Sequence, residues 1–176
     1  MGKAISLVDC ALGRVAKVFQ RSCAIGETVR VLENQRVLIR PARLGDADQV
    51  WPLVHDFGPS FAPERREFET TWRTLSETAD TLVAVAEVTG HQIVGYVLAN
   101  SRLTFVANGP VAWVEEVMVA KSHRRFGVGR ELMEHAENWA AERGASYLAL
   151  ASRRAGPFYL RLGYEDAAVF YKKPLV

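Results

Sequence analysis

Two glycines and three arginines gather where an apolar stretch of the chain gives way to a helical pattern. A helix N-terminus carries free backbone N–H groups and a partial positive charge, so it can hold an anion. Gly127 and Gly129 would let a phosphate approach the backbone without a Cβ in the way, and Arg124, Arg125 and Arg130 add positive charge. The spacing indicates a pyrophosphate site, although the same residues would also make a tight turn with a solvated rim.

Two common phosphate-binding motifs do not fit this segment. No Lys-Ser or Lys-Thr pair follows the glycines, which excludes a Walker A loop. The third glycine of the dinucleotide fingerprint is absent, and the preceding strand follows a hairpin where that fold would begin a βαβ unit.

Composition limits the class of protein. The chain has 176 residues, 49% of them hydrophobic, with 22 basic and 20 acidic residues and a net charge of +2, which predicts one globular domain without a nucleic-acid-binding face. Two cysteines provide neither a disulfide framework nor a zinc site, and the four histidines lack ligand spacing, so we expect no metal. Apolar runs too short for a membrane span favour a cytoplasmic protein without membrane contact.

The order of the predicted elements points to a mixed sheet. Hydrophobic periodicity and turn residues predict strand 37–42, helices 45–57 and 62–79, strands 81–88, 92–103 and 111–120, helix 127–143, strand 146–152, helix 155–163 and an extended final strand over 164–175. Asp46 is the expected N-cap of the first helix. A hairpin followed by a strand–helix–strand unit predicts an α/β fold with helices on both faces of the sheet.

Residues 1–35 differ from the rest of the chain. Apolar side chains at helical spacing over residues 8–22 predict an amphipathic helix, which we interpret as an N-terminal arm that packs on its own domain or on a partner subunit. The arm makes a homodimer possible. A transit peptide, a surface anchor or N-myristoylation of the first residues are alternatives.

Two segments carry a resemblance to a known family. The segment "VEEVMVAKSHRRFGVGRELM" resembles the acyl-CoA-binding core of the GNAT superfamily of N-acetyltransferases, with Arg124, Gly127 and Gly129 matching its Q/R-x-x-G-x-G/A signature. The later "SRRAGPFYLRLGY" resembles the second core segment of that superfamily. The similarity covers residues 36–176 and implies the GNAT acyl-CoA N-acyltransferase fold, a mostly antiparallel mixed sheet of about six to seven strands with helices on both faces.

The resemblance implies acetyl-CoA as the cofactor, bound where two parallel strands splay apart. In that family the pantetheine arm pairs with the strand before the loop, and the loop amides hold the pyrophosphate. Ser152 stands where many members have an asparagine, so it would make a single contact with pantetheine. The cofactor-binding residues implied here are Val117, Met118, Val119, Arg124, Arg125, Phe126, Gly127, Val128, Gly129, Arg130, Ser152 and Phe158.

Three residues are candidates for catalysis. Tyr159 matches the tyrosine that GNAT enzymes use to protonate the departing CoA sulfur, although a tyrosine among apolar residues is more often part of the core. Glu115 and Glu116 are candidate bases, and in a regular strand only one of them could face the acceptor. A β-bulge, which this strand has in the family, would change that. We expect Glu115 to act as base and Glu116 to orient the ammonium, the alternative being that one of them pairs with a core arginine.

These residues together predict an N-acetyltransferase that moves an acetyl group from acetyl-CoA to a primary amine of a small molecule by direct attack in a ternary complex. A non-catalytic acyl-CoA-binding regulatory module and a protein or peptide N-acetyltransferase are the alternatives. The segment 55–68 is the expected acceptor lid. Within it, Phe57, Pro59 and Phe61 could contact an apolar part of the substrate, and Arg65 or Arg66 a carboxylate, unless the segment is only a helix hinge.

Overall fold

A single mixed sheet forms the centre of the protein, whose computed structural model describes residues 28–32, 35–57 and 62–175. In the described part of the chain the sheet has six strands, which lie side by side in the order of the sequence. Each strand pairs antiparallel with the next, except that β5 and β6 are parallel. Their bounds are β1 Thr28–Leu32, β2 Gln35–Pro41, β3 Thr81–Val88, β4 Gln92–Thr104, β5 Gly109–Val119 and β6 Leu148–Leu150. The predicted mixed, mostly antiparallel α/β architecture is confirmed.

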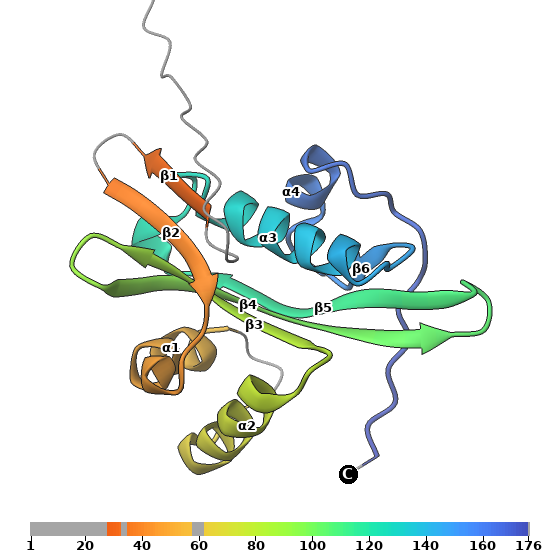
Figure 1. Cartoon of the computed structure of the whole chain (residues 1–176), viewed down its shortest axis with the longest axis horizontal. Coiled ribbons are helices and arrows are strands. Elements are labelled where there is room, and N and C mark those ends of the chain that lie inside the picture. The colour runs from red at the N-terminus through yellow and green to blue at the C-terminus, as the bar shows by residue number, and fades with distance from the viewer. Residues whose placement is uncertain (1–27, 33–34, 58–61, 176) are drawn as a thin grey trace, which may run out of the picture.

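Helices cover both faces of the sheet, as predicted. On one face lie α1 (Ala47–His55) and α2 (Arg65–Glu77), and on the other lie α3 (Val128–Glu142) and α4 (Gly156–Arg161), as Figure 1 shows. Two short 3-10 turns, η1 (Leu44–Asp46) and η2 (Lys121–His123), precede α1 and α3. None of the helices in the described part of the chain has the length and apolar composition of a membrane span.

Each face of the sheet has its own apolar core, because side chains of successive strand residues point to opposite faces. Val97 and Ala99 of β4 pack with α3, whereas Tyr96 packs with α1 and α2. The stripe predicted for α3 is buried against the sheet and consists of Val128, Leu132, Ala136, Trp139 and Ala140. The two faces can therefore carry different parts of a site.

Gly95 of β4 lies where the sheet leaves no room for a side chain. A Cβ placed on it would lie 2.8 Å from the carbonyl oxygen of Met118 and 3.1 Å from the Leu132 side chain. Because the backbone of β5 cannot move aside cheaply, we expect Gly95→Ala to lower the free energy of unfolding by about 1–3 kcal/mol. Urea denaturation measures this change. Gly109→Ala, where nothing lies within 4 Å of an added Cβ, is the control; equal losses in both variants would contradict the prediction.

Two predictions at the ends of the chain are corrected. Residues 28–32, assigned to the N-terminal arm, form β1 and pair with β2, because only the tertiary partner reveals a strand this short. The helical stripe over residues 8–22 lies outside the described residues. Residues 164–175, predicted as a final extended strand, are irregular in structure because no neighbouring strand pairs with them.

A buried ionic cluster joins β2, η1 and β3. Arg40, only 5% exposed, donates two hydrogen bonds to Asp46 at 2.7 and 2.9 Å and one to Glu87 at 2.7 Å. The prediction that Asp46 is the N-cap residue of α1 is confirmed, although its side chain makes no capping hydrogen bond to that helix. Asp46 stands at the N-cap position, but its carboxylate accepts hydrogen bonds from Arg40 and from the backbone N–H of Arg43. The cluster fixes the chain entering α1 against the sheet.

Candidate active site

The loop before α3 presents backbone donors at its surface. Gly127, the residue before the helix, has φ 91° and ψ −8°, a left-handed conformation that suits glycine. Arg125 is also left-handed, with φ 69°. The first helical hydrogen bond runs from the N–H of Glu131 to the carbonyl of Gly127, so the N–H groups of Val128, Gly129 and Arg130 have no intrahelical acceptor. No side chain caps this end of α3, so the donors are available to an anion.

Gly129 lies between α4 and the end of β5. A Cβ at this position would lie 3.4 Å from the Phe158 ring and 3.8 Å from Val119. The structure thus brings together three of the predicted cofactor-binding residues from three different elements. Phe126, another of them, is 52% exposed on the loop.

Arg124 and Ser152 make contacts within the chain. The Nε of Arg124 donates to the carbonyl oxygen of Val119 at 2.9 Å, and its Nη2 lies 3.6 Å from the sulfur of Met118. The Ser152 hydroxyl accepts a hydrogen bond from the N–H of Ala155 at 3.1 Å, just before α4. Arg124 therefore secures the loop to the end of β5, and Ser152 secures the start of α4.

The parallel pair β5 and β6 separates after three residues. Ala112, Trp113 and Val114 pair with Leu148–Leu150, and beyond them β5 continues to Val119 paired with β4 alone. The N–H of Ala120 bonds to Val94 of β4, and backbone groups alternate in direction along an antiparallel strand. Those of Val117 and Val119 therefore point away from β4, toward the side where β6 has ended.

A β-bulge in β5 places both candidate bases on one face. Leu98 pairs with Glu116 and Ala99 with Val114, which leaves Glu115 as an extra residue. Glu115 accepts a hydrogen bond from Asn100 Nδ2 at 2.6 Å, and Glu116 accepts one from the Tyr96 hydroxyl at 2.6 Å. Since Tyr96 and Asn100 are an even number of residues apart in β4, both carboxylates lie on the face opposite α3. The bulge that we considered is confirmed.

Tyr159 lies on the α3 side of the sheet. Its half-buried ring packs edge-on against Phe158 and Tyr164, with ring centroids 5.0 and 5.9 Å away. Burial raises the pKa of Tyr159, so its hydroxyl stays protonated through the neutral range. Burial and the nearby Glu137 carboxylate raise the pKa of Tyr164 as well. Tyr159 thus keeps its proton on the face of the sheet that α3 covers.

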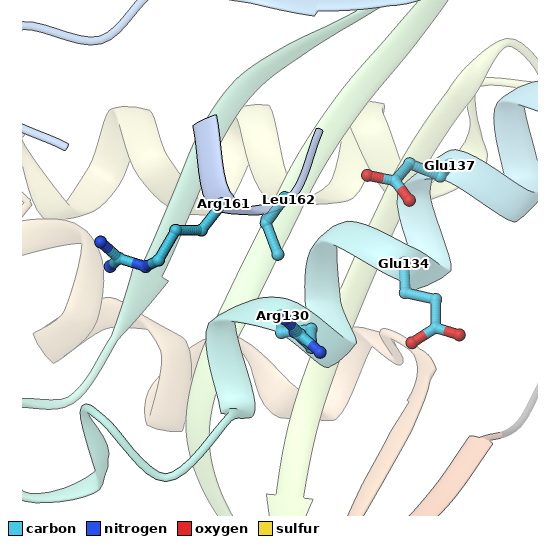
Figure 2. A pocket seen from close by; sticks show the side chains of 5 residues that line it. All are labelled: Arg130, Glu134, Glu137, Arg161 and Leu162. Carbon is cyan, nitrogen blue, oxygen red and sulfur yellow. The ribbon is translucent and has the colours of Figure 1, made fainter. Parts of the chain in front are cut away.

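An open groove of about 300 Å³ runs between α3 and α4. Figure 2 shows Arg130, Glu134 and Glu137 on α3 facing Arg161 and Leu162 at the end of α4. Sequence reasoning missed the α4 side of this groove, because the local pattern does not show how close two helices pack. Among the described residues, no three histidine, cysteine, aspartate or glutamate side chains converge as a metal site.

The segment predicted as acceptor lid is described only in part. Phe57 is 44% exposed, while Pro59 and Phe61 lie outside the described residues. Arg65 pairs with Asp48 and with Glu69, so its guanidinium already meets carboxylates of the chain itself. Arg66 is exposed on the first turn of α2.

Comparison with known proteins identifies the family. The model of the acetyltransferase (GNAT) family matches residues 47–164, which include both glutamates, the α3 loop and α4. The chain belongs to the GNAT family. The resemblance that the sequence motifs predicted is thereby confirmed.

Several GNAT relatives show how far the similarity extends. A streptothricin acetyltransferase of Streptomyces lavendulae is 42% identical over 77 residues, covering 41% of this chain and 36% of that protein. The matched part is therefore only about a third of that relative. An uncharacterised N-acetyltransferase of Bacillus subtilis, YhfO, is 24% identical over 75% of this chain and 92% of its own length.

Solved structures share the fold. A glucosamine-6-phosphate N-acetyltransferase from Arabidopsis thaliana superposes with a TM-score of 0.70 at 18% identity, covering 80% of this chain and 99% of that one. A transcriptional regulator from Bacillus halodurans gives the same TM-score at 23% identity, with 79% and 99% covered. At these identities the likeness concerns the GNAT fold alone.

Proposed function

We propose that this protein transfers an acetyl group from acetyl-CoA to a primary amine of a small-molecule acceptor. The observation that carries the proposal is the opening between β5 and β6. On the face of the sheet that α3 covers lie the unpaired N–H groups at the start of α3 and the side chain of Tyr159, and on the opposite face lie the carboxylates of Glu115 and Glu116. A thioester in this opening would have its phosphates at a positive helix end and its carbonyl near two acids.

The α3 side fits coenzyme A. The free N–H groups of Val128, Gly129 and Arg130 would hold the pyrophosphate, and Arg130 and Arg161 beside the groove of Figure 2 supply positive charge for the rest of the nucleotide. The outward backbone groups of Val117 and Val119 would pair with the pantetheine amides. Arg124 already occupies the Val119 carbonyl, which leaves the Val119 N–H and both backbone groups of Val117 for this purpose.

Both proton transfers have a candidate residue. The amine nitrogen attacks the thioester carbonyl carbon, and the carbon–sulfur bond then breaks to give the acetamide and the CoA thiolate. Glu115 takes one proton from the bound ammonium so that the neutral amine can attack, the nitrogen releases its second proton to water as the amide forms, and Tyr159 gives its proton to the thiolate. Glu116 orients the acceptor ammonium, so acceptor and thioester react in one ternary complex without an acyl-enzyme.

Among acceptors, a small cationic amine is favoured. Neither Glu115 nor Glu116 has an ion-pair partner among the described residues, and both are at least partly accessible. The relative from Streptomyces lavendulae acts, by its name, on streptothricin. Similarity to it over 77 residues supports a small-molecule acceptor over a protein, without identifying which one.

Acetyl-CoA binding and CoA release over a panel of amines test the proposal. We expect Gly129→Val to weaken acetyl-CoA binding at least about tenfold, because its side chain would fill the space between Phe158 and Val119 near the pyrophosphate amides. Gly45→Val, at a glycine with open space around it, is the control and should bind normally. Calorimetry measures affinity, and thermal unfolding verifies that both variants fold.

Each outcome of this experiment has a clear meaning. Binding of acetyl-CoA with release of CoA only in the presence of an amine supports the proposed reaction. Binding without turnover for every amine would indicate the non-catalytic module instead. Unchanged affinity in Gly129→Val would show that the cofactor does not lie at the start of α3.

A further inference from the structure

The Tyr96 hydroxyl is a polar group on a side chain that is buried in an apolar core. Its residue is 3% exposed and packs with the α1 and α2 core, among Val50, Leu53 and Trp72. A buried hydroxyl without a hydrogen bond costs free energy, and phenylalanine would fill nearly the same volume without that cost. Here the hydroxyl donates to Glu116 Oε2 at 2.6 Å, a length typical of a charge-assisted bond.

The Tyr96 hydroxyl keeps its proton, and therefore remains a hydrogen-bond donor, at neutral pH. Burial, together with the charge of Glu116 and the hydrogen bond to it, raises the pKa of Tyr96 far above neutral. The phenol therefore stays protonated. Because its ring is enclosed by the core, the hydroxyl cannot follow the carboxylate if Glu116 moves.

Glu115 has a different kind of partner. Asn100, which is half-buried, donates its amide to Glu115 Oε1 at 2.6 Å, and Glu115 is exposed on the bulge. A bulged residue is outside the regular ladder, so its side chain has more freedom than that of Glu116, which pairs in register with Leu98. One carboxylate is fixed by a rigid donor and the other is held by an adjustable one.

Each carboxylate keeps one oxygen for a ligand. No hydrogen bond to Oε1 of Glu116 or Oε2 of Glu115 is present within the described part of the chain, and neither carboxylate has a cation beside it there. Tyr96 and Asn100 supply hydrogen bonds but no positive charge. The pair is therefore complementary to a cationic group from outside the chain.

We propose that Tyr96 is a positioning residue that fixes Glu116 as the binding point for the acceptor ammonium, leaving Glu115, held by Asn100, to take the proton. This inference rests on the proposed function and assigns different tasks to its two acids. Tyr96 acts only through Glu116, because its hydroxyl is enclosed by the core and does not reach the acceptor.

A double-mutant cycle between Tyr96 and Glu116 tests the inference. We expect Tyr96→Phe to raise the KM of the amine about tenfold while kcat changes by less than about twofold, since the change removes ground-state binding. Glu116→Gln should have a similar effect, and Tyr96→Phe should add almost nothing in the Glu116→Gln background. Asn100→Ala should instead lower kcat and shift its pH profile. Tyr147→Phe, at an exposed tyrosine, is the control.

A binding readout makes the test independent of turnover. Spermidine, lysinamide and kanamycin are titrated by calorimetry into protein saturated with CoA, and Tyr96→Phe should weaken the tightest of them about tenfold. Additive effects of the two substitutions, an unchanged affinity in Tyr96→Phe, or no binding of any of the three amines to the wild type would overturn the inference.

The two proposals fail in different ways. A wild type that binds amines in a Tyr96-dependent manner and never releases CoA would contradict the proposed function and support the positioning role. A Tyr96→Phe variant that turns over with the wild-type KM would contradict the positioning role and leave the proposed function intact.

Discussion

Tyr159→Phe should lower turnover by about 10²-fold, with little change in the affinity for acetyl-CoA. A loss of at least about tenfold is the smallest effect that agrees with the proposed role. In the proposed mechanism the hydroxyl provides the proton for the CoA thiolate, and without it the leaving group would have to take a proton from water. The ring itself remains, so its edge-on packing against Phe158 and Tyr164 is preserved. Single-turnover measurements of CoA release, compared with calorimetric binding of acetyl-CoA, separate the chemical step from cofactor binding.

The control for this substitution is Tyr171→Phe, at a tyrosine that is 87% exposed in the C-terminal segment. It makes the same chemical change at an exposed position and should leave turnover unchanged. An undiminished rate in Tyr159→Phe would remove Tyr159 from the mechanism. A parallel loss of acetyl-CoA affinity would show instead that the hydroxyl helps to bind the cofactor.

Arg40→Met should be the most destabilising single change that the described core allows us to predict. It would leave the carboxylates of Asp46 and Glu87 buried without their cation, at a cost of about 3–5 kcal/mol in the free energy of unfolding. That is a large part of the total stability of a typical domain. Arg65→Met, which removes an exposed pair of ionic contacts, should cost less than about 1 kcal/mol. Urea denaturation of both variants measures the difference, and equal losses would contradict the prediction.

The same cluster predicts a dependence on pH. Desolvation alone would raise the pKa values of Asp46 and Glu87, but hydrogen bonds from Arg40, with further ones from the Arg43 amide and from His91, hold both below their ordinary values. Their contribution is therefore complete above the ordinary carboxyl pKa values of 3.8 and 4.5 and is lost as pH falls through the lower folded-state values.

We therefore expect the stability gap between wild type and Arg40→Met to be widest near neutral pH and to narrow in acid. Urea midpoints at about pH 7 and about pH 3 test this expectation. A gap of constant size would mean that Arg40 does not lower the pKa values of the two carboxylates in the folded protein.

Local motifs in the sequence were sufficient to predict the part of the candidate site that lies at the start of α3. The glycines and arginines before α3 predicted its open N-terminus, and the placement of Phe158 against Gly129 agrees with a common cofactor surface. The register in which the strands pair could not be predicted from the sequence. The sequence could suggest a bulge, but only the register of β4 and β5 locates it at Glu115.

Other features depend on contacts between distant parts of the chain. Tyr96 and Asn100 look like ordinary strand residues in the sequence, and only the alignment of β4 with β5 places them beside Glu116 and Glu115. Likewise β1 is defined by its partner β2. Residues 164–175 show the reverse case, in which strand-like composition is present but none of the described strands pairs with the segment.

The extra residue in β5 leaves the packing of the sheet undisturbed. Val114 before the bulge and Val117 after it both face α3, so a strand lacking Glu115 would join Val114 directly to Glu116 with both cores in their present alternation. Such a shortened strand would be regular and would carry a single carboxylate. Glu115 thus adds a second acidic group to the strand as one extra residue, and the alternation of side chains that fills both hydrophobic cores is the same on either side of it.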